Sequence, residues 1–258
     1  YWEKRYAEQG ENTTFDWLED YTTIKPLIDK LELKSEVKVL NLGCGNAEFS
    51  EDMYDDGYSN IVNIDIAENV ILFMKERNKD RKKMTFEVMD VRDIKYEASF
   101  YDLIIDKSTI DALLCGENSY LNVAIMLKEV QRVLKDEGCY MIISYGKPEN
   151  RIPHLERAHL DFDISVYTIK KDIEENPDLT KTHYVYICKK KKGANLVSEK
   201  NFDFVCYELE QQELMDKELA EEDENDNYDN NELDELEELN SDGENDLYEA
   251  KCQGLNDK

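Results

Sequence analysis

Segments typical of β-strands alternate with segments typical of α-helices through the first part of the chain. Apolar, strand-like runs occur at residues 37–42, 60–65, 84–89, 101–106 and 140–145, and helix-like runs at about 46–56, 67–79 and 118–136. In the last helix-like run, apolar residues recur at steps of three and four, and Gly138 ends the run before the next strand. This alternation predicts an α/β fold with a mostly parallel, doubly wound sheet.

The pattern changes after residue 150. Residues 161–170 and 182–190 are rich in β-branched and aromatic side chains, and a polar connection with a proline separates them. We expect them to form an antiparallel pair at the edge of the sheet. From residue 207 to residue 258 the chain contains 21 acidic residues and 3 lysines. Such a composition buries too little apolar surface to fold alone, so we expect one domain over 1–206 and an acidic, disordered tail over 207–258.

The charge of the chain limits its partners. Its 258 residues carry a formal net charge of −28, which excludes general wrapping of nucleic acid and disfavours a polybasic membrane anchor. Apolar runs stay shorter than a membrane-spanning helix. Six cysteines without a CxxC pair are typical of a reduced, intracellular chain, and three scattered histidines predict no metal site. We expect a cytoplasmic location, and the sequence leaves the oligomeric state open.

Residues at the ends of the first three strand-like runs are suited to a nucleoside ligand. Gly43 and Gly45 follow the first run and precede a helix-like run, where glycines permit a tight turn and close approach of the backbone to a ligand. Asp65 ends the second run, where a carboxylate accepts both hydrogen bonds of a ribose diol. Asp90 ends the third run and is the candidate acceptor for an adenine amine, with the amide of Val91 beside it.

Two cofactors use a glycine turn of this kind, NAD and S-adenosyl-L-methionine (SAM). A dinucleotide fold requires a third glycine where Glu48 stands, whereas SAM has no pyrophosphate and does not need that close approach. The residues therefore favour SAM. The fourth strand leads into Asp106-Lys107-Ser108-Thr109, beyond the carboxyl end where ligands bind. Amino-adenine methylases carry (D/N)PP(Y/F) at that place, so the sequence argues against methylation of a base.

Four motifs occur in the order found in a known family: YWEKRY at residues 1–6, FDW at 15–17, LGCGN at 42–46 and DKSTIDAL at 106–113. Over about residues 1–200 the chain resembles class I SAM-dependent methyltransferases, in particular the family of EEF1A lysine methyltransferase 4 and methyltransferase-like 13. The resemblance implies a Rossmann-like sheet of seven strands. It also implies that aromatic residues near the start fold over the cofactor and that a set of residues lines the SAM site: Trp2, Tyr6, Trp17, Gly43, Asp65, Ile66, Asp90, Val91 and Lys107.

The chain departs from the family pattern at two positions. Ser108 replaces the usual glycine of the family, which predicts an altered loop after the fourth strand. Asn41 stands where many methyltransferases have an acidic residue. This weakens any argument for a carboxylate that helps to hold the methionine ammonium.

By the same resemblance, the chain is expected to be a protein-lysine N-methyltransferase acting on translation elongation factor 1A. A lysine acceptor must first lose its proton, and Asp106 and Asp111 are the candidate catalytic residues that orient the amine. An acid at either position can equally cap a helix or hold Lys107. The alternative function is methylation of a small molecule, because the same cofactor half serves many acceptors. A third reading is a binding protein without activity, against which the intact set of glycines and acids speaks.

Overall fold

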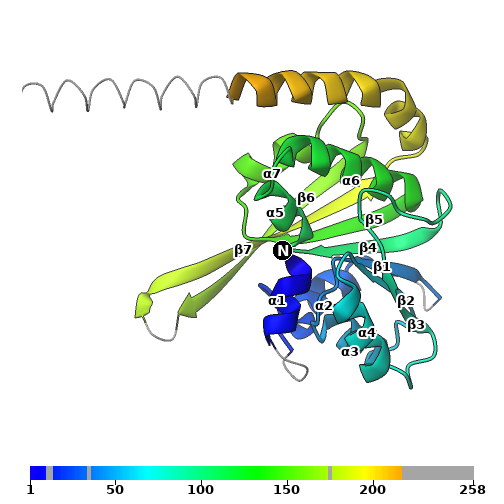
Figure 1. The fold of residues 1–258 in the computed structure, drawn as a ribbon, viewed down its shortest axis with the longest axis vertical. Coiled ribbons are helices and arrows are strands. Elements are labelled where there is room, and N and C mark those ends of the chain that lie inside the picture. The colour runs from blue at the N-terminus through cyan, green and yellow to red at the C-terminus, as the bar shows by residue number, and fades with distance from the viewer. Residues whose placement is uncertain (10–13, 34–35, 174–175, 217–258) are drawn as a thin grey trace, which may run out of the picture. The chain divides into compact units, whose positions relative to one another are not determined.

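One sheet of seven strands organises the part of the chain that the structure describes. The computed structural model describes residues 1–9, 14–33, 36–173 and 176–216. The strand order is β3-β2-β1-β4-β5-β7-β6 (Figure 1). The parallel strands are β1 (Lys38–Leu42), β2 (Asn60–Asp65), β3 (Met84–Val88), β4 (Tyr101–Lys107) and β5 (Leu134–Ser144). β7 (Asn176–Lys190) is antiparallel to both β5 and β6 (Phe162–Ile173). The predicted doubly wound, seven-stranded sheet with an antiparallel C-terminal pair is confirmed.

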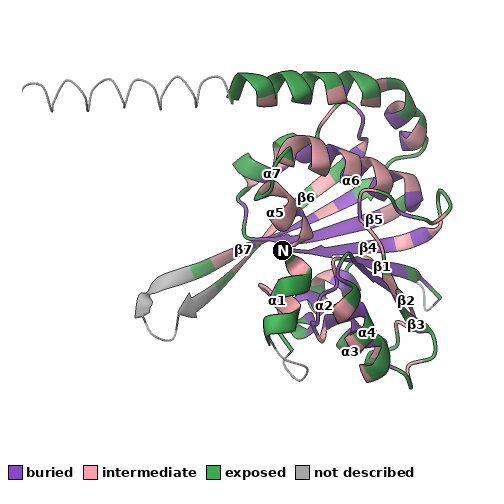
Figure 2. Cartoon of the chain, viewed as in Figure 1, coloured by how far each residue is buried: buried purple, intermediate pink, exposed green. Residues whose placement is uncertain are grey.

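Helices cover both faces of this sheet. The first layer contains α2 (Tyr21–Asp29), α3 (Phe49–Asp55) and α4 (Glu68–Arg77), with α1 (Trp2–Gln9) against α4. The other layer contains α5 (Thr109–Leu114), α6 (Ser119–Val133) and α7 (Pro148–Leu155). Each layer shares an apolar core with its face of the sheet, and the strands between the layers are buried along most of their length (Figure 2). Burial on both faces explains why the parallel strands are continuous apolar runs.

The helix predicted over 118–136 is shorter than its apolar pattern suggested. α6 ends at Val133, and Leu134 already has an extended backbone and begins β5. The pairing of β5 with β4 is interrupted, because Leu134 pairs with Tyr101 but the next pair is Cys139 with Leu103. Gly138 lies in this irregularity, where an added Cβ would be 2.9 Å from the carbonyl of Lys135. Gly138 therefore permits a bulge inside a strand and does not end the helix.

The C-terminal strand pair is longer than predicted. The expected polar connection after residue 170 is mostly strand, because Lys170 pairs with Thr182 and Asp172 with Thr180. Hydrogen bonding along the ladder thus continues through a segment whose composition is typical of a loop. β6 forms the outer edge, and β7 lies between it and β5.

A further helix follows the sheet at residues 194–209, and its Val205 and Leu209 pack on Ala124 of α6. The chain divides into two compact units, residues 1–209 and 210–258. Of the second unit the structure describes residues 210–216, which are helical. The proposed domain limit at residue 206 stays a prediction. So does the disorder of the acidic tail, most of which lies outside the described residues.

Candidate cofactor and acceptor site

The turn between β1 and α3 depends on its two glycines. Gly43 and Gly45 both have left-handed backbone angles, with φ of +55° and +54°. A Cβ on Gly43 would lie 2.3 Å from Oγ1 of Thr109, which donates a hydrogen bond to the carbonyl of Leu42. A Cβ on Gly45 would lie 2.7 Å from the hydroxyl of Tyr6. The turn is therefore a cradle that only glycine fits, closed on one side by Thr109 at the start of α5 and on the other by Tyr6 of α1.

Asp65 joins this turn to the start of α4. Its carboxylate accepts hydrogen bonds from the N–H of Gly45 and the N–H of Ala67, both at 2.9 Å. Burial raises the pKa of Asp65, while these backbone donors act in the opposite direction. Each oxygen keeps acceptor capacity beyond its backbone bond, which suits a diol. The neighbouring side chain of Ile66 is 53% exposed and offers an apolar surface beside that carboxylate.

Asn41 belongs to a buried network and not to this surface. Its amide donates to Oγ of Ser50 at 2.8 Å and to Oδ1 of Asn63 at 3.1 Å. The network links β1, β2 and α3 beneath the glycine turn. Both partners of Asn41 are neutral polar side chains. They would not compensate the buried charge of an acid at this position, so the neutral Asn41 suits its surroundings.

The N-terminal helix lies over the turn and against α4. The carboxylate of Glu3 accepts from the N–H of Glu68, and the carbonyl of Glu3 accepts from the side chain of Asn69 at 2.8 Å. An acid at this place also favours the positive end of α4. The rings of Trp2 and Tyr6 stack with centroids 6.1 Å apart. Tyr6 is thereby held with its hydroxyl beside Gly45.

A second N-terminal segment, residues 14–20, is tied to the end of β4. Nζ of Lys107 donates to Asp16 at 2.6 Å and to the carbonyl of Trp17 at 3.1 Å. Burial lowers the pKa of Lys107, and the adjacent Asp16 acts in the opposite direction. The guanidinium of Arg5 lies 4.8 Å from the ring centroid of Trp17 and 5.7 Å from that of Trp2. The structure thus brings Trp2, Tyr6, Trp17 and Lys107 together above the glycine turn, with Lys107 as the tether.

The end of β3 is less open than the sequence suggested. Asp90 forms a two-pronged ion pair with Arg92, whose Nη2 is 2.6 Å and Nε 3.0 Å from the carboxylate oxygens. This partner lowers the pKa of Asp90. Val91 is buried in the core below α6. Any adenine amine must therefore share the Asp90 carboxylate with Arg92.

Asp106 has the contacts of a helix cap. It is fully buried, and its carboxylate accepts from the N–H of Thr109 at 2.8 Å, from the N–H of Ile110 and from the hydroxyl of Tyr140. Burial raises the pKa of Asp106 to about 7. Its catalytic role stays a prediction, and these contacts favour the capping of α5 that the sequence left as an alternative.

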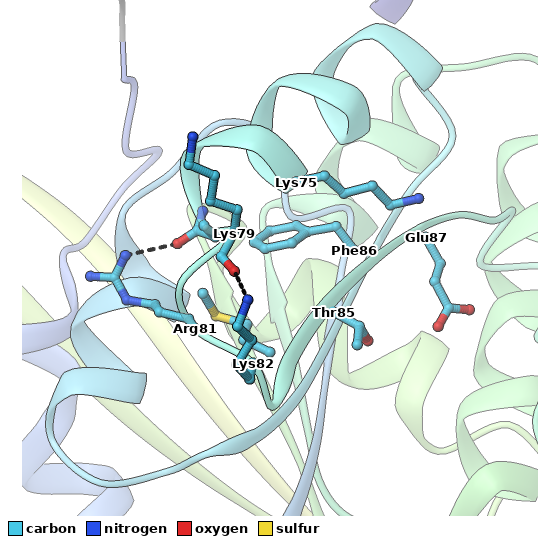
Figure 3. A pocket seen from close by; sticks show the side chains of 9 residues that line it. Lys75, Lys79, Arg81, Lys82, Thr85, Phe86 and Glu87 are labelled. Atoms are coloured by element: carbon cyan, nitrogen blue, oxygen red, sulfur yellow. Dashed lines mark hydrogen bonds between the residues drawn. The ribbon is translucent and has the colours of Figure 1, made fainter.

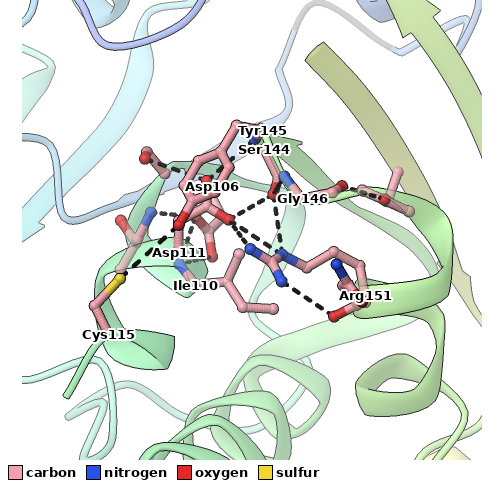
Figure 4. A network of polar contacts seen from close by, with 12 residues as sticks. Asp106, Ile110, Asp111, Cys115, Ser144, Tyr145, Gly146 and Arg151 are labelled. Atoms are coloured by element: carbon pink, nitrogen blue, oxygen red, sulfur yellow. Dashed lines mark hydrogen bonds and ion pairs between the residues drawn. The ribbon is translucent and has the colours of Figure 1, made fainter. Parts of the chain in front are cut away.

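Asp111 is the centre of a buried polar network (Figure 4). Its Oδ1 lies 2.7 Å from Nη2 and 3.1 Å from Nε of Arg151 on α7, and it also accepts from Ser144 at the end of β5. A Cβ on Gly146 would lie 2.2 Å from the guanidinium carbon of Arg151. Above this network the ring of Tyr145 is 52% exposed. Asp111 thus supports the loop that carries Tyr145, and its role in orienting an amine stays a prediction.

Sequence reasoning missed the partners that hold the predicted residues. Arg151 lies in Pro148–Leu155, 40 positions beyond Asp111, and no local pattern indicates a buried arginine there. At Ser108, by contrast, the usual glycine of the family indicates a backbone conformation that favours glycine. Ser108 has a left-handed backbone, with φ of +68°, which glycine adopts without strain. The loop after β4 therefore keeps the conformation expected for glycine.

A separate hollow lies near the amino end of β3 (Figure 3). Basic side chains from the end of α4 and the following turn surround it, namely Lys75, Lys79, Arg81 and Lys82. The glycine turn and Asp65 belong to the opposite, carboxyl edge of the sheet. The hollow is thus not part of the cofactor site.

Within residues 1–9, 14–33, 36–173 and 176–216, acidic residues, histidines and cysteines form no group of three suited to a metal ion. The helices of these same ranges are too short or too polar to cross a membrane.

The glycine cradle, the Asp65 carboxylate and the aromatic side chains beside them fit a nucleoside cofactor with a small charged end, as expected for a SAM-dependent methyltransferase. The chain belongs to the methyltransferase domain family, whose model matches residues 33–224. SAM is the cofactor of this class, and the residues around Gly45 and Asp65 fit it.

Two relatives of known name are similar to this chain. The eEF1A lysine and N-terminal methyltransferase of Mus musculus is 43% identical over 150 residues, covering 57% of this chain and 21% of that protein. EEF1A lysine methyltransferase 4 of Mus musculus is 28% identical over 172 residues, covering 64% of this chain and 67% of that protein. This chain therefore matches only about a fifth of the first relative's length. A SAM-dependent methyltransferase of Methanosarcina mazei shares the fold, with a TM-score of 0.50 and 16% identity over 64% of this chain and 97% of that one.

Proposed function

We propose that this protein is a protein-lysine N-methyltransferase that acts on translation elongation factor 1A. The observation that carries the proposal is the 43% identity to a relative named for methylation of that factor. EEF1A lysine methyltransferase 4 supports it independently, since its similarity extends over two thirds of its own length. The glycine turn, Asp65, the N-terminal segments and the end of β4 meet at one edge of the sheet.

SAM, when bound, supplies an activated methyl group for in-line displacement by the acceptor. The work of the chain is to hold both partners and exclude water. Gly43 and Gly45 let the backbone approach the cofactor, and Asp65 accepts from its diol. Trp2 and Tyr6 cover the site from α1, and Lys107 holds Trp17 over it. An aromatic cover suits a sulfonium through cation–π attraction.

The acceptor enters on the side of α5 and α7. Tyr145 offers an exposed aromatic surface there, and Cys115 lies 3.8 Å from its hydroxyl. A lysine inserted beside these groups is partly desolvated, which lowers the pKa of its amine and favours the neutral nucleophile. Asp106 and Asp111 support the walls of this region, because each already accepts from several donors.

Methylation of a small molecule is the alternative function. It requires an acceptor pocket closed on all sides, whereas the exposure of Tyr145 favours a broad acceptor surface. We therefore prefer the protein acceptor. A cytoplasmic location fits this substrate and is part of the proposal.

The test is transfer of labelled methyl from SAM into a lysate of cells that lack the protein, with separate counting of protein and small-molecule fractions. We expect label in one protein band, identified as elongation factor 1A and mapped to lysine. The control is Gly45→Val, in which the new side chain collides with Tyr6 and blocks the cradle. Label that enters only small molecules supports the alternative, and label in neither fraction contradicts both enzymatic functions.

A further inference from the structure

The antiparallel pair β6–β7 continues past the edge of the sheet at which the cofactor site lies. The last residue of β5 to pair with β7 is Ser144, opposite Tyr184. Pairing of β6 with β7 continues beyond it, from Ile169 opposite His183 to Ile173 opposite Asn176. We call residues 169–173 and 176–183 the ribbon. It projects beyond the carboxyl ends of the parallel strands (Figure 1).

The ribbon is long enough to contact the surface of a folded protein. Eight positions separate Tyr184 from Asn176. At about 3.3 Å per residue, the ribbon extends roughly 26 Å past the last pair with β5. A metabolite that binds beside the sulfonium would contact only a small part of such an extension.

The base of the ribbon is fixed to the elements that cover the cofactor site. Nδ1 of His183 lies 2.7 Å from the carboxylate of Glu19, and both side chains are buried. Glu19 belongs to the same N-terminal segment as Trp17, which Lys107 tethers. The ring of Tyr167 on β6 is contacted as well, because Nζ of Lys30 lies 5.2 Å from its centroid. These side-chain contacts, together with the strand pairing, fix the base of the ribbon relative to the candidate cofactor site.

The edges of the ribbon are open. β6 is the outermost strand of the sheet, and beyond Tyr184 no other described strand pairs with the β5-side edge of β7. Backbone N–H and C=O groups on such an edge form a template for another extended chain. The side chains at the base are accessible too, because Val166 is 38% exposed and Thr168, Lys170 and Lys181 are exposed.

We propose that the ribbon is the docking arm for the protein substrate, whose extended segment pairs with the β5-side edge of β7 and delivers the lysine toward Tyr145. This rests on the proposed function, since it assumes a folded protein acceptor. Three features favour a protein substrate as the partner of the ribbon. These are its position beyond the carboxyl edge, its length and its unpaired backbone. A nucleic acid is disfavoured by the net charge of −28.

The first test shortens the ribbon. Lys170 and Thr182 are cross-strand partners, so replacement of residues 171–181 by Asn-Gly joins them through a turn suited to a two-residue hairpin. Binding of purified elongation factor 1A is measured by interferometry, and methylation is measured on the folded factor and on a short peptide around its target lysine. We expect at least tenfold weaker binding and a tenfold lower kcat/KM for the folded factor. SAM affinity and methylation of the peptide should change less than twofold.

The outcomes separate the two proposals. An inactive wild-type protein contradicts the proposed function, while the binding measurement still tests the ribbon. Unchanged binding and unchanged kcat/KM in the shortened variant overturn the docking arm. A loss of activity that accompanies a change from dimer to monomer overturns it as well, because the open edge would then join two copies.

A second variant avoids any effect of shortening on folding. A photo-crosslinking residue in place of Lys181 should capture purified elongation factor 1A, since Lys181 is exposed on β7. The matched control places the same residue at Lys79, which is exposed near the amino edge of the sheet. Equal capture at both positions, or none at position 181, contradicts the proposal.

Discussion

The ion pair between Asp111 and Arg151 offers a quantitative test of the acceptor side. Asp111→Asn and Arg151→Met each remove one partner, and the double variant removes both charges. The two side chains are 2% and 7% exposed, and the shortest N–O distance between them is 2.7 Å. Either single change leaves a buried charge without its partner.

The expected effects follow from that burial. Removal of one member of a buried pair costs about 3 to 5 kcal/mol, whereas replacement of both members by neutral groups is often close to neutral. Hydrogen bonds from Ser144 and Tyr145 compensate Asp111 in part, so we take the lower value. A loss of about 3 kcal/mol corresponds to a fall in Tm of roughly 6 to 12 °C for a domain of this size. The double variant should recover at least half of the loss.

The assay combines urea denaturation with methyl transfer on the four proteins of the cycle. If Asp111 supports the Tyr145 loop, stability and turnover should both recover in the double variant. If Asp111 orients the amine, stability should recover while turnover stays low. Strictly additive losses of stability would refute the reasoning, because they would mean that the two charges do not interact.

Three further predictions concern the glycine turn, Lys107 and Asp106. Gly45→Val should weaken SAM binding at least tenfold by calorimetry and lower Tm, because its Cβ would be 2.7 Å from the Tyr6 hydroxyl; an unchanged affinity would contradict the cradle. Lys107→Met should weaken SAM binding about tenfold and increase hydrogen exchange in residues 14–20, whereas Lys147→Met, at an exposed position, should do neither. Asp106 has a pKa of about 7 when folded, so the folded protein keeps a proton that the unfolded chain releases above about pH 4. Stability should therefore fall as pH rises from 5 to 7, by about 2 kcal/mol more than in Asp106→Asn; equal slopes in urea melts would contradict this.

The sequence sufficed for the fold and for the placement of the glycine turn and Asp65, because these features depend on local patterns. Buried parallel strands appear as apolar runs, and the turn at Gly43 and Gly45 lies at a fixed place between strand and helix. Asp65 follows from the same logic, since it ends the neighbouring strand. These features need no knowledge of distant contacts.

The contacts that hold the site residues in place join distant segments of the chain. Arg151 reaches Asp111 across 40 positions, and Lys107 reaches Asp16 across 91. Neither pairing leaves a periodic signal in the sequence. The length of the ribbon was missed for a related reason, because ladder pairing between β6 and β7 overrides the loop-like composition after Lys170.

The most direct test of the central claim uses purified components. The protein is incubated with SAM and unmodified elongation factor 1A, and the factor is then digested and its peptides are identified by mass spectrometry. We predict methylation of a lysine that is lost with Gly45→Val and retained with Lys147→Met. An unmodified factor, after incubation with a wild-type protein that binds SAM normally, would contradict the account.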